Sequence, residues 1–356
     1  APAPRSIAGA CAMIPVSVIT GFLGSGKTTM LSHLLRQPAL ADTAVIINEF
    51  GEIGLDHDLI ETSDETTVTL QTGCLCCKMQ DDLVRTLHDL LERRREGTVP
   101  PFARVVVETS GLADPAPILQ SLMMDETTAT HFPLSRVLTV VDAVTGGNSL
   151  ANHLEARHQL AVADHVVVSK TDLSGGIPED LAPFLHAAWA AGNITTSDRG
   201  RVPPALLFAE GRADGAALLD TIERLLSPAW MGKGDDQHHR RAHIHVDDAI
   251  DTFVLRRDAP LNAVTLSLFL EALADHCGAD LLRLKGLVQV CEDPEHPAVI
   301  HGVQHVFHPP AWLPAWPSAD RRTRMIFIAR NIRESWVRAL LDAIEAEVKA
   351  AARDAN

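Results

Sequence analysis

The segment GFLGSGKTT, at residues 21–29, constrains the fold of this chain more than any other feature. It matches the pattern G-x-x-x-x-G-K-[ST], in which glycines allow successive backbone N–H groups to curve around an anion. The apolar run 16–20 comes directly before it and predicts a buried strand, and the apolar spacing within 27–36 predicts a helix directly after it. A strand, a glycine-rich loop and a helix in this order predict a phosphate-binding loop.

Within this loop the residue types predict separate roles. The Lys27 ammonium would neutralise the β and γ phosphates of a nucleotide, and the Thr28 hydroxyl would bind Mg²⁺. The remaining nucleotide contacts are expected from the rest of the loop, namely Gly21, Gly24, Ser25, Gly26 and Thr29. The alternative is a glycine-rich turn with a surface lysine, and the flanking strand and helix argue against it.

Apolar runs alternate with helical stretches through residues 15–226. This alternation predicts an α/β fold, with the doubly wound, mostly parallel sheet of a P-loop NTPase. The expected strands are 16–20, 44–48, 104–108, 137–141, 165–169 and 205–209, and the expected helices include 27–36 and 81–94. Residues 1–14 lack a continuous apolar stretch, so we interpret them as a flexible terminus and not as a secretory signal.

Apolar periodicity is lost in SPAWMGKGDDQHHRRAHIH, which places a linker at 227–245. Its four histidines are candidates for a weak metal store, although a solvated linker explains them nearly as well. Residues 246–350 then predict a smaller α+β domain, with EDPEHP as a turn between antiparallel strands. The expected strands are 249–257, 281–291, 298–308 and 325–331, and the expected helices are 261–276 and 334–349.

A second nucleotide-binding element is expected in VVVETSG, where an apolar strand ends at Glu108. A carboxylate at a strand tip can hold Mg²⁺ or position an attacking water, and the N–H of Gly111 can approach a γ-phosphate. Glu108 could instead be a carboxylate at a helix start. The position of Glu108 at the tip of a strand in a doubly wound sheet favours the nucleotide role.

A third element is expected in VVVSKTD, which ends a later strand at Ser169, Lys170 and Asp172. The Asp172 carboxylate can accept hydrogen bonds from the N1–H and the exocyclic amine of guanine, whereas adenine offers no such pair of donors. Taken alone, S-K-T-D is more often a polar turn. Its place after two other nucleotide elements favours guanine recognition.

Three thiols lie within four residues in QTGCLCCKM, at Cys74, Cys76 and Cys77. Thiolates select soft or borderline ions, which favours Zn²⁺ or Cu(I) over Mg²⁺. Tetrahedral zinc needs a fourth ligand, for which Glu52 is the candidate that we choose, with Glu49, His57, water or a partner as alternatives. Buried structural cysteines or a redox pair are the competing interpretations.

The overall composition limits the classes of partner. The 31 basic and 46 acidic residues give a net charge of −15, so the average surface would repel nucleic acid. No apolar run reaches the roughly 18 residues that a membrane span needs. Clustered thiols without a disulfide framework predict a reducing, cytoplasmic environment.

The motifs GFLGSGKTT, INEFGEIGLD, GCLCC, ETSGLADP and SKTD, in this order, resemble the CobW family of P-loop GTPases, which are relatives of UreG and HypB. RLKGLV and HGVQHVFHPP extend the resemblance into the second domain, so that it covers about 15–341. One departure is Ser169, which stands where GTPases usually have Asn and has a shorter reach for bracing the loop.

The resemblance implies a GTP-dependent metallochaperone that uses GTP and Mg²⁺, carries Zn²⁺ or Co²⁺ and has a metalloprotein client. We expect hydrolysis to be slow, because no arginine finger is evident, and a partner or a homodimer to accelerate it. We also expect nucleotide to order 48–56, which lies between the loop and the thiols. The competing functions are an ATP-using small-molecule kinase and a non-enzymatic metal buffer with a structural nucleotide.

Overall fold

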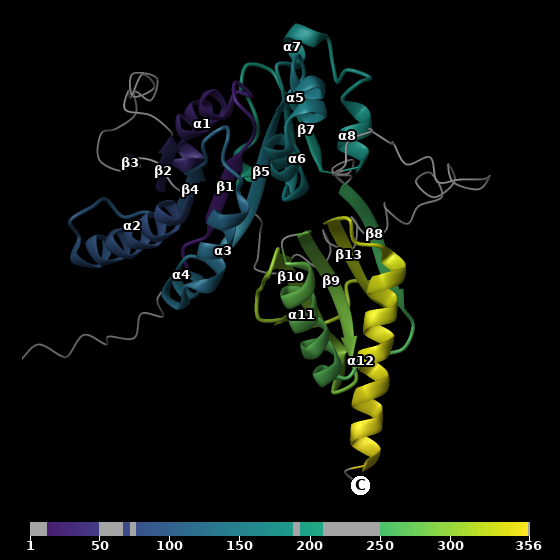
Figure 1. Ribbon diagram of the computed structural model, residues 1–356. Helices are drawn as coiled ribbons and strands as arrows, with labels where there is room; N and C mark the ends of the chain where they lie inside the picture. The colour runs from purple at the N-terminus through teal and green to yellow at the C-terminus, as the bar shows by residue number, and fades with distance from the viewer. Residues whose placement is uncertain are drawn as a thin grey trace, which may run out of the picture.

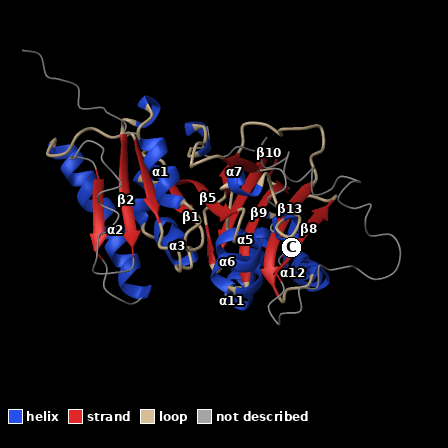
Figure 2. Ribbon diagram, turned by 90° about the horizontal axis from the view of Figure 1, so that it is seen from above, coloured by secondary structure: helices blue, strands red, loops and turns tan. Residues whose placement is uncertain are grey.

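The computed structural model describes residues 13–49, 67–71, 76–187, 193–208, 250–278 and 280–354. These residues form two sheets, each with its own helices (Figures 1 and 2). The expected linker at 227–245 lies outside the described residues. Within the described part of the chain, no helix is both long and apolar enough to cross a membrane.

The first sheet has seven strands in the order β3-β2-β4-β1-β5-β6-β7, and every neighbouring pair is parallel. Its central strands are almost fully buried, because helices cover both faces. The strands are β1 (Val16–Thr20), β2 (Thr43–Glu49), β3 (Thr67–Gln71), β4 (Arg104–Glu108), β5 (Leu134–Asp142), β6 (His165–Ser169) and β7 (Ile194–Ser197).

The helices divide between the two faces of this sheet. On one face, α1 (Lys27–Leu35) packs its methionine and leucines against alternate residues of β1, β5 and β6. On the other face lie α2 (Cys76–Glu96) and α3 (Ala116–Met124), followed by α5 and α6. The expected doubly wound α/β fold is therefore confirmed. The remaining short helices are η1 (Pro38–Leu40), α4 (Glu126–His131), α5 (Gly146–Asn152), α6 (Leu154–Ala161), α7 (Thr171–Ser174), α8 (Ala182–Ala187) and η4 (Pro204–Leu206).

One expected strand of this sheet is wrong. Residues 205–209 were expected to pair, but Pro203 and Pro204 start the 3₁₀ turn η4 instead. Proline presets φ and removes a backbone donor, so it suits such a turn and not an interior strand. Leu207 is nevertheless fully buried against the α1 face, and its carbonyl accepts a hydrogen bond from Ser17 Oγ. The run is apolar because its residues pack in the core, although they do not pair as a strand. The strand at this edge of the sheet is β7 instead.

The C-terminal sheet is antiparallel in the order β11-β10-β9-β13-β8, with the short β12 paired to β10. Helices α11 (Ala263–Cys277) and α12 (Glu334–Asp354) pack on one face, so the expected α+β domain is confirmed (Figure 1). The strands are β8 (Ile250–Arg257), β9 (Leu281–Val290), β10 (Asp293–Val303), β11 (Val306–Phe307), β12 (Ala311–Trp312) and β13 (Thr323–Arg330).

Two details of this sheet differ from expectation. The expected strand 298–308 is broken, because Gln304 has φ 53° and turns the chain between β10 and β11. The expected turn EDPEHP is shorter, since Cys291 and Glu292 make the turn and β10 already begins at Asp293. A register shift between Asp293 and Ala298 accommodates the proline-containing stretch.

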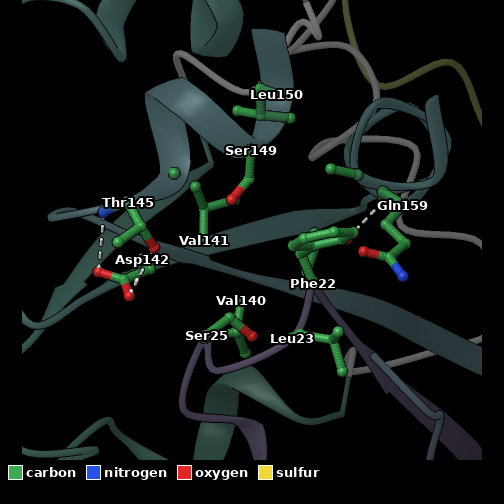
Figure 3. Close-up of a pocket in the computed structure, with 13 residues that line it drawn as sticks. Phe22, Leu23, Ser25, Val140, Val141, Asp142, Thr145, Ser149, Leu150 and Gln159 are labelled. Atoms are coloured by element: carbon green, nitrogen blue, oxygen red, sulfur yellow. Dashed lines mark hydrogen bonds between the residues drawn. The ribbon is translucent and has the colours of Figure 1, made fainter. Parts of the chain in front are cut away.

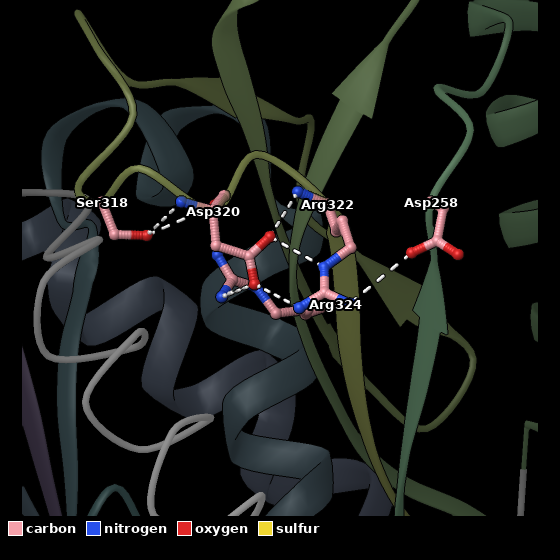
Figure 4. A network of polar contacts seen from close by, with 5 residues as sticks. All are labelled: Asp258, Ser318, Asp320, Arg322 and Arg324. Carbon is pink, nitrogen blue, oxygen red and sulfur yellow. Dashed lines mark hydrogen bonds and ion pairs between the residues drawn. The ribbon is translucent and has the colours of Figure 1, made fainter.

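The carboxylate of Asp320, three residues before β13, accepts several hydrogen bonds within the loop that leads into that strand (Figure 4). Asp320 accepts hydrogen bonds from Arg322 Nε at 2.9 Å and from Arg324 Nη1 at 3.2 Å. Arg322 also reaches Asp258 at 3.6 Å. The Arg322 hydrogen bond, against a smaller opposing effect of burial, lowers the pKa of Asp320 to about 2.

We expect Asp320→Asn to lower the free energy of unfolding by about 1 kcal/mol near neutral pH. A depressed folded-state pKa stabilises the fold above the ordinary value of 3.8 and loses that effect as the pH falls through about 2. The difference between wild type and variant should therefore shrink from pH 5 to pH 2 in urea titrations. Asp258→Asn is the control, because Asp258 is 88% exposed and its loss should change the free energy of unfolding little. A constant difference for Asp320→Asn across this range would contradict the assignment.

Candidate functional site

The glycine-rich loop joins β1 to α1, as its sequence predicts. Gly21, Gly24 and Gly26 have φ angles of 144°, 69° and 93°, and Gly26 is the residue that precedes the first turn of α1. Lys27 is the first helical residue and is 8% exposed. Its Nζ donates hydrogen bonds to the Gly21 carbonyl at 2.9 Å and to the Phe22 carbonyl at 3.3 Å. The lysine ammonium is thus held against the backbone of the loop.

The structure brings together the two oxygen donors that were expected to share a cation. Thr28 Oγ1 donates a hydrogen bond to Glu108 Oε1 at 2.7 Å, although the two residues are 80 positions apart. Register explains the approach, because Glu108 ends β4 directly beside Ile19 of β1. Glu108 is 4% exposed. A hydroxyl and a carboxylate at this distance are ligands of the kind that Mg²⁺ prefers.

The segment after β4 packs directly onto the loop. A Cβ added at Gly111 would lie 2.9 Å from the backbone nitrogen of Leu23, so only glycine fits without a shift. Thr109 N donates to the Ile19 carbonyl at 2.9 Å and continues the β1–β4 pairing. Gly111 therefore lies beside the loop, as its predicted role requires.

The S-K-T-D motif is tied to the loop at two points. Ser169 Oγ donates to the Ser25 carbonyl at 2.6 Å, and Lys170 Nζ donates to the Gly24 carbonyl at 2.8 Å. The serine thus braces the loop despite its short side chain. Asp172 is exposed in the first turn of α7, where its carboxylate is accessible to a base.

Sequence reasoning missed one acidic member of this arrangement. Asp142 ends β5, and its Oδ2 accepts a hydrogen bond from Lys170 Nζ at 2.7 Å. Burial opposes ionisation of Asp142, but hydrogen bonds from Lys170, the Val144 amide and Thr145 together lower its pKa. Its only signal in the sequence is an acidic residue at the end of an apolar run, VLTVVD.

A small pocket lies between the loop and helices α5 and α6 (Figure 3). Phe22 and Ser25 line it from the loop, and Asp142, Ser149 and Gln159 line it from β5, α5 and α6. Its volume of about 20 Å³ suits a water molecule and not a nucleotide. The pocket is therefore too small to be the expected nucleotide site, and it separates the loop from the helices behind it.

Most of the expected transition-metal site lies outside the described residues. This applies to Cys74, Glu52 and residues 50–56 of the segment expected to be ordered by nucleotide. Cys76 and Cys77 begin α2, but their side chains are outside the description. Among the described residues, no group of three or more His, Cys, Asp or Glu side chains could hold a metal ion.

The strand order nevertheless shows how far β3, the strand that comes before the thiol motif, lies from the strand that ends at Glu108. β3 ends at Gln71 beside Glu49 of β2, and β2 in turn pairs with β4, where Ile47 lies beside Glu108. All these strands are parallel, so their carboxyl ends share one edge of the sheet. The thiol motif follows β3 directly in the sequence, and β3 is two strands from β4, a spacing of about 10 Å.

Known proteins match this chain over both sheets. Residues 15–184 match the CobW/HypB/UreG nucleotide-binding domain, and residues 250–345 match the cobalamin synthesis protein CobW C-terminal domain. The zinc chaperone YjiA of Escherichia coli is 31% identical over 326 residues, covering 92% of this chain and 97% of that protein. The zinc chaperone CobW of a Sinorhizobium species is 28% identical over 93% of this chain and 97% of its own length.

A solved structure matches over the same extent. The crystal structure of Zn(II)-bound YjiA GTPase from E. coli aligns with a TM-score of 0.64 at 25% identity. The alignment covers 93% of this chain and 99% of that one.

Proposed function

This chain belongs to the CobW/HypB/UreG family, and from that premise we propose that it is a GTP-binding and GTP-hydrolysing metallochaperone. The metal that it carries is zinc, which is supported by the names of its relatives in E. coli and Sinorhizobium. It binds this metal at Cys74, Cys76 and Cys77, with Glu52 as a further ligand, and delivers it to a client metalloprotein in the cytoplasm.

The phosphate chemistry rests on the loop and its neighbours. Backbone N–H groups of 21–29 and the N-terminus of α1 surround the phosphates, and the Lys27 ammonium exchanges its loop carbonyls for phosphate oxygens. Thr28 and Glu108 fit Mg²⁺, which would supply charge neutralisation at the phosphates. Gly111 offers its N–H beside the loop, and Glu108 orients the attacking water.

Base recognition rests on the S-K-T-D motif. Ser169 and Lys170 anchor it to the loop, and the exposed Asp172 accepts the two hydrogen bonds that guanine offers. A kinase that uses ATP would gain nothing from a carboxylate at this position, because adenine lacks that pair of donors. The three residues therefore favour GTP.

The shared sheet edge is the observation on which the proposal depends. β3, which ends at Gln71 just before the thiol motif in the sequence, and β4, which ends at Glu108, are separated in the sheet only by β2, and this supports the proposal. A change in the nucleotide near Glu108 is thus transmitted over a short distance to the metal ligands. Zinc affinity would then depend on the nucleotide, and hydrolysis would trigger release to the client.

Titration of a non-hydrolysable GTP analogue with and without Zn²⁺ tests this proposal. Linkage is reciprocal, so we expect zinc to change the affinity for the analogue about 5-fold or more, and the analogue to change the affinity for zinc by the same factor. Cys76→Ala should remove the effect. The matched control is Cys291→Ala, an exposed cysteine of the C-terminal sheet, which should retain it.

This titration, together with binding and hydrolysis assays that compare GTP with ATP, gives each competing function its own outcome. Identical affinities with and without zinc would rule out the coupling and favour a simple metal buffer. Equal binding and turnover of ATP and GTP would favour the kinase. Absence of binding by either nucleotide would overturn the nucleotide assignment itself.

A further inference from the structure

Helix α6 contacts both the segment beside the phosphate loop and the C-terminal sheet, and it carries none of the sequence motifs described above (Figure 1). Gln159 of α6 is fully buried. Its Nε2 donates to the Gly111 carbonyl at 3.1 Å and to the Ala113 carbonyl at 3.0 Å. The amide therefore fixes two peptide groups of the turn that carries the Gly111 N–H.

A neighbouring side chain holds the end of the same turn. His158 Nδ1 lies 3.1 Å from Asp114 Oδ2, while Asp114 Oδ1 accepts a hydrogen bond from the Ala116 amide at 2.9 Å. Burial acts against ionisation of Asp114, but these two hydrogen bonds keep its pKa below the ordinary value. Residues 111–114 are consequently attached to α6 at three points.

The same end of α6 also contacts the C-terminal sheet. Ala161, its last residue, packs in one apolar cluster with Leu282, Ile326 and Ile328 of β9 and β13. Three residues later, Asp164 Oδ1 accepts hydrogen bonds from Arg283 Nη2 at 2.6 Å and from Lys285 Nζ.

Asp164 also has a fixed partner in the first sheet. Its Oδ2 accepts a hydrogen bond from the Val137 amide of β5 at 2.8 Å. Burial opposes its ionisation, yet the charges of Arg283 and Lys285 hold the pKa of Asp164 far below the ordinary range. A buried carboxylate with two cations from the other sheet cannot move without them, because either charge left alone would be costly.

Helix α3, which begins two residues after Asp114, connects the same turn to the C-terminal sheet by a second route. Gln120 Nε2 of α3 donates to Gln304 Oε1 at 2.7 Å, in the turn between β10 and β11. Val303 and Val306, on either side of that turn, are buried in the apolar cluster that contains Leu119. Both attachments of residues 111–114 therefore lead to the C-terminal sheet.

We propose that the C-terminal domain reads the nucleotide state of the loop through α6, with Gln159 as the positioning residue that joins this helix to Gly111. A γ-phosphate that draws the Gly111 N–H towards it displaces two carbonyls held by Gln159, and α6 carries Asp164 and its two cations with it. The orientation of the C-terminal domain, and with it any client surface on that domain, then differs between GTP and GDP. This inference rests on the proposed nucleotide site.

Amide hydrogen exchange on the wild-type chain tests the inference without a variant. With a GTP analogue in place of GDP, we expect altered exchange at 109–114 and also at 281–290 and 302–307. A change confined to 109–114 would overturn the inference while leaving the nucleotide site intact. If neither nucleotide binds, the proposed function fails as well, so the two failures are distinguishable.

Affinity measurements on variants provide the reciprocal test. Gln159→Met keeps the length and removes both donors, and Lys285→Met removes one cation from Asp164. We expect each to change the ratio of GDP to GTP-analogue affinities by about 5-fold. Arg322→Met is the control, since it removes an ion pair of the same domain, with Asp320, that includes no residue of α6 and does not involve Asp164. Unchanged ratios in both variants, with intact folding by circular dichroism, would contradict the coupling.

Discussion

Gly21→Ala is expected to destabilise the protein by about 4 kcal/mol or more, which is a rare magnitude for the gain of one methyl group. A Cβ at this position would lie 2.2 Å from the Val140 carbonyl oxygen, and that carbonyl belongs to the backbone of β5. β5 is paired on both sides, so it has no room to retreat. The φ of 144° adds a second cost for any L side chain.

Thermal unfolding of the nucleotide-free protein measures this effect, and a fall in melting temperature of roughly 10 °C is expected. Gly24→Ala is the matched control, because its φ is also positive, at 69°, but among the described residues other than its chain neighbours no atom lies within 4 Å of the added Cβ. This variant carries only the left-handed backbone cost of about 1 kcal/mol. Equal destabilisation by the two variants would show that contact with β5 is not the cause.

Lys27→Met is expected to reduce GTP hydrolysis about 100-fold or more while leaving the fold intact. The reason is electrostatic, since the ammonium lies where the loop curves and is 8% exposed, so its charge acts there through little intervening water. Phosphate release under single-turnover conditions measures the loss, and circular dichroism monitors folding.

Lys349→Met is the control for that experiment, because Lys349 is exposed on α12 and pairs only locally with Glu345 at 2.6 Å. It should hydrolyse GTP at the wild-type rate. We expect zinc binding to survive in Lys27→Met, whereas nucleotide-dependent transfer of zinc to a chelating acceptor should stop. Transfer that continues unchanged would favour a metal buffer, and hydrolysis that continues would place catalysis elsewhere.

The parallel sheet was predictable because its strands are buried on both faces. Such strands are continuous apolar runs, as in RVVVE and HVVVS, and each one is followed by a polar motif at its carboxyl end. The edge strand TVTLQ was missed, since three of its five residues are polar and, in the described sheet, it pairs with a neighbour on one side only. The strand predicted at 205–209 was wrong for the opposite reason, because Leu207 is buried in the core without pairing to another strand.

In the candidate site, too, some residues are positioned by the local sequence and others by contacts with residues far away in the chain. Strand, loop and helix are contiguous in sequence, and so the placement of Lys27 and Thr28 follows from local pattern. Asp142 and Gln159 act across the fold, on Lys170 and on Gly111, and no local pattern encodes such partners. A polar residue on the buried side of a short helix was the only available sign for Gln159.

The hydrogen bonds of the Lys27 ammonium also have a consequence for the protein when no nucleotide is bound. An ammonium so far from solvent would be costly if it had no acceptor, yet two oxygens of its own turn already satisfy it. Arrival of a triphosphate is therefore an exchange of acceptors, and departure of the diphosphate reverses it. Between ligands the Lys27 ammonium thus stays hydrogen-bonded, and its two bonds to the loop help to keep the backbone in the shape that receives the next ligand.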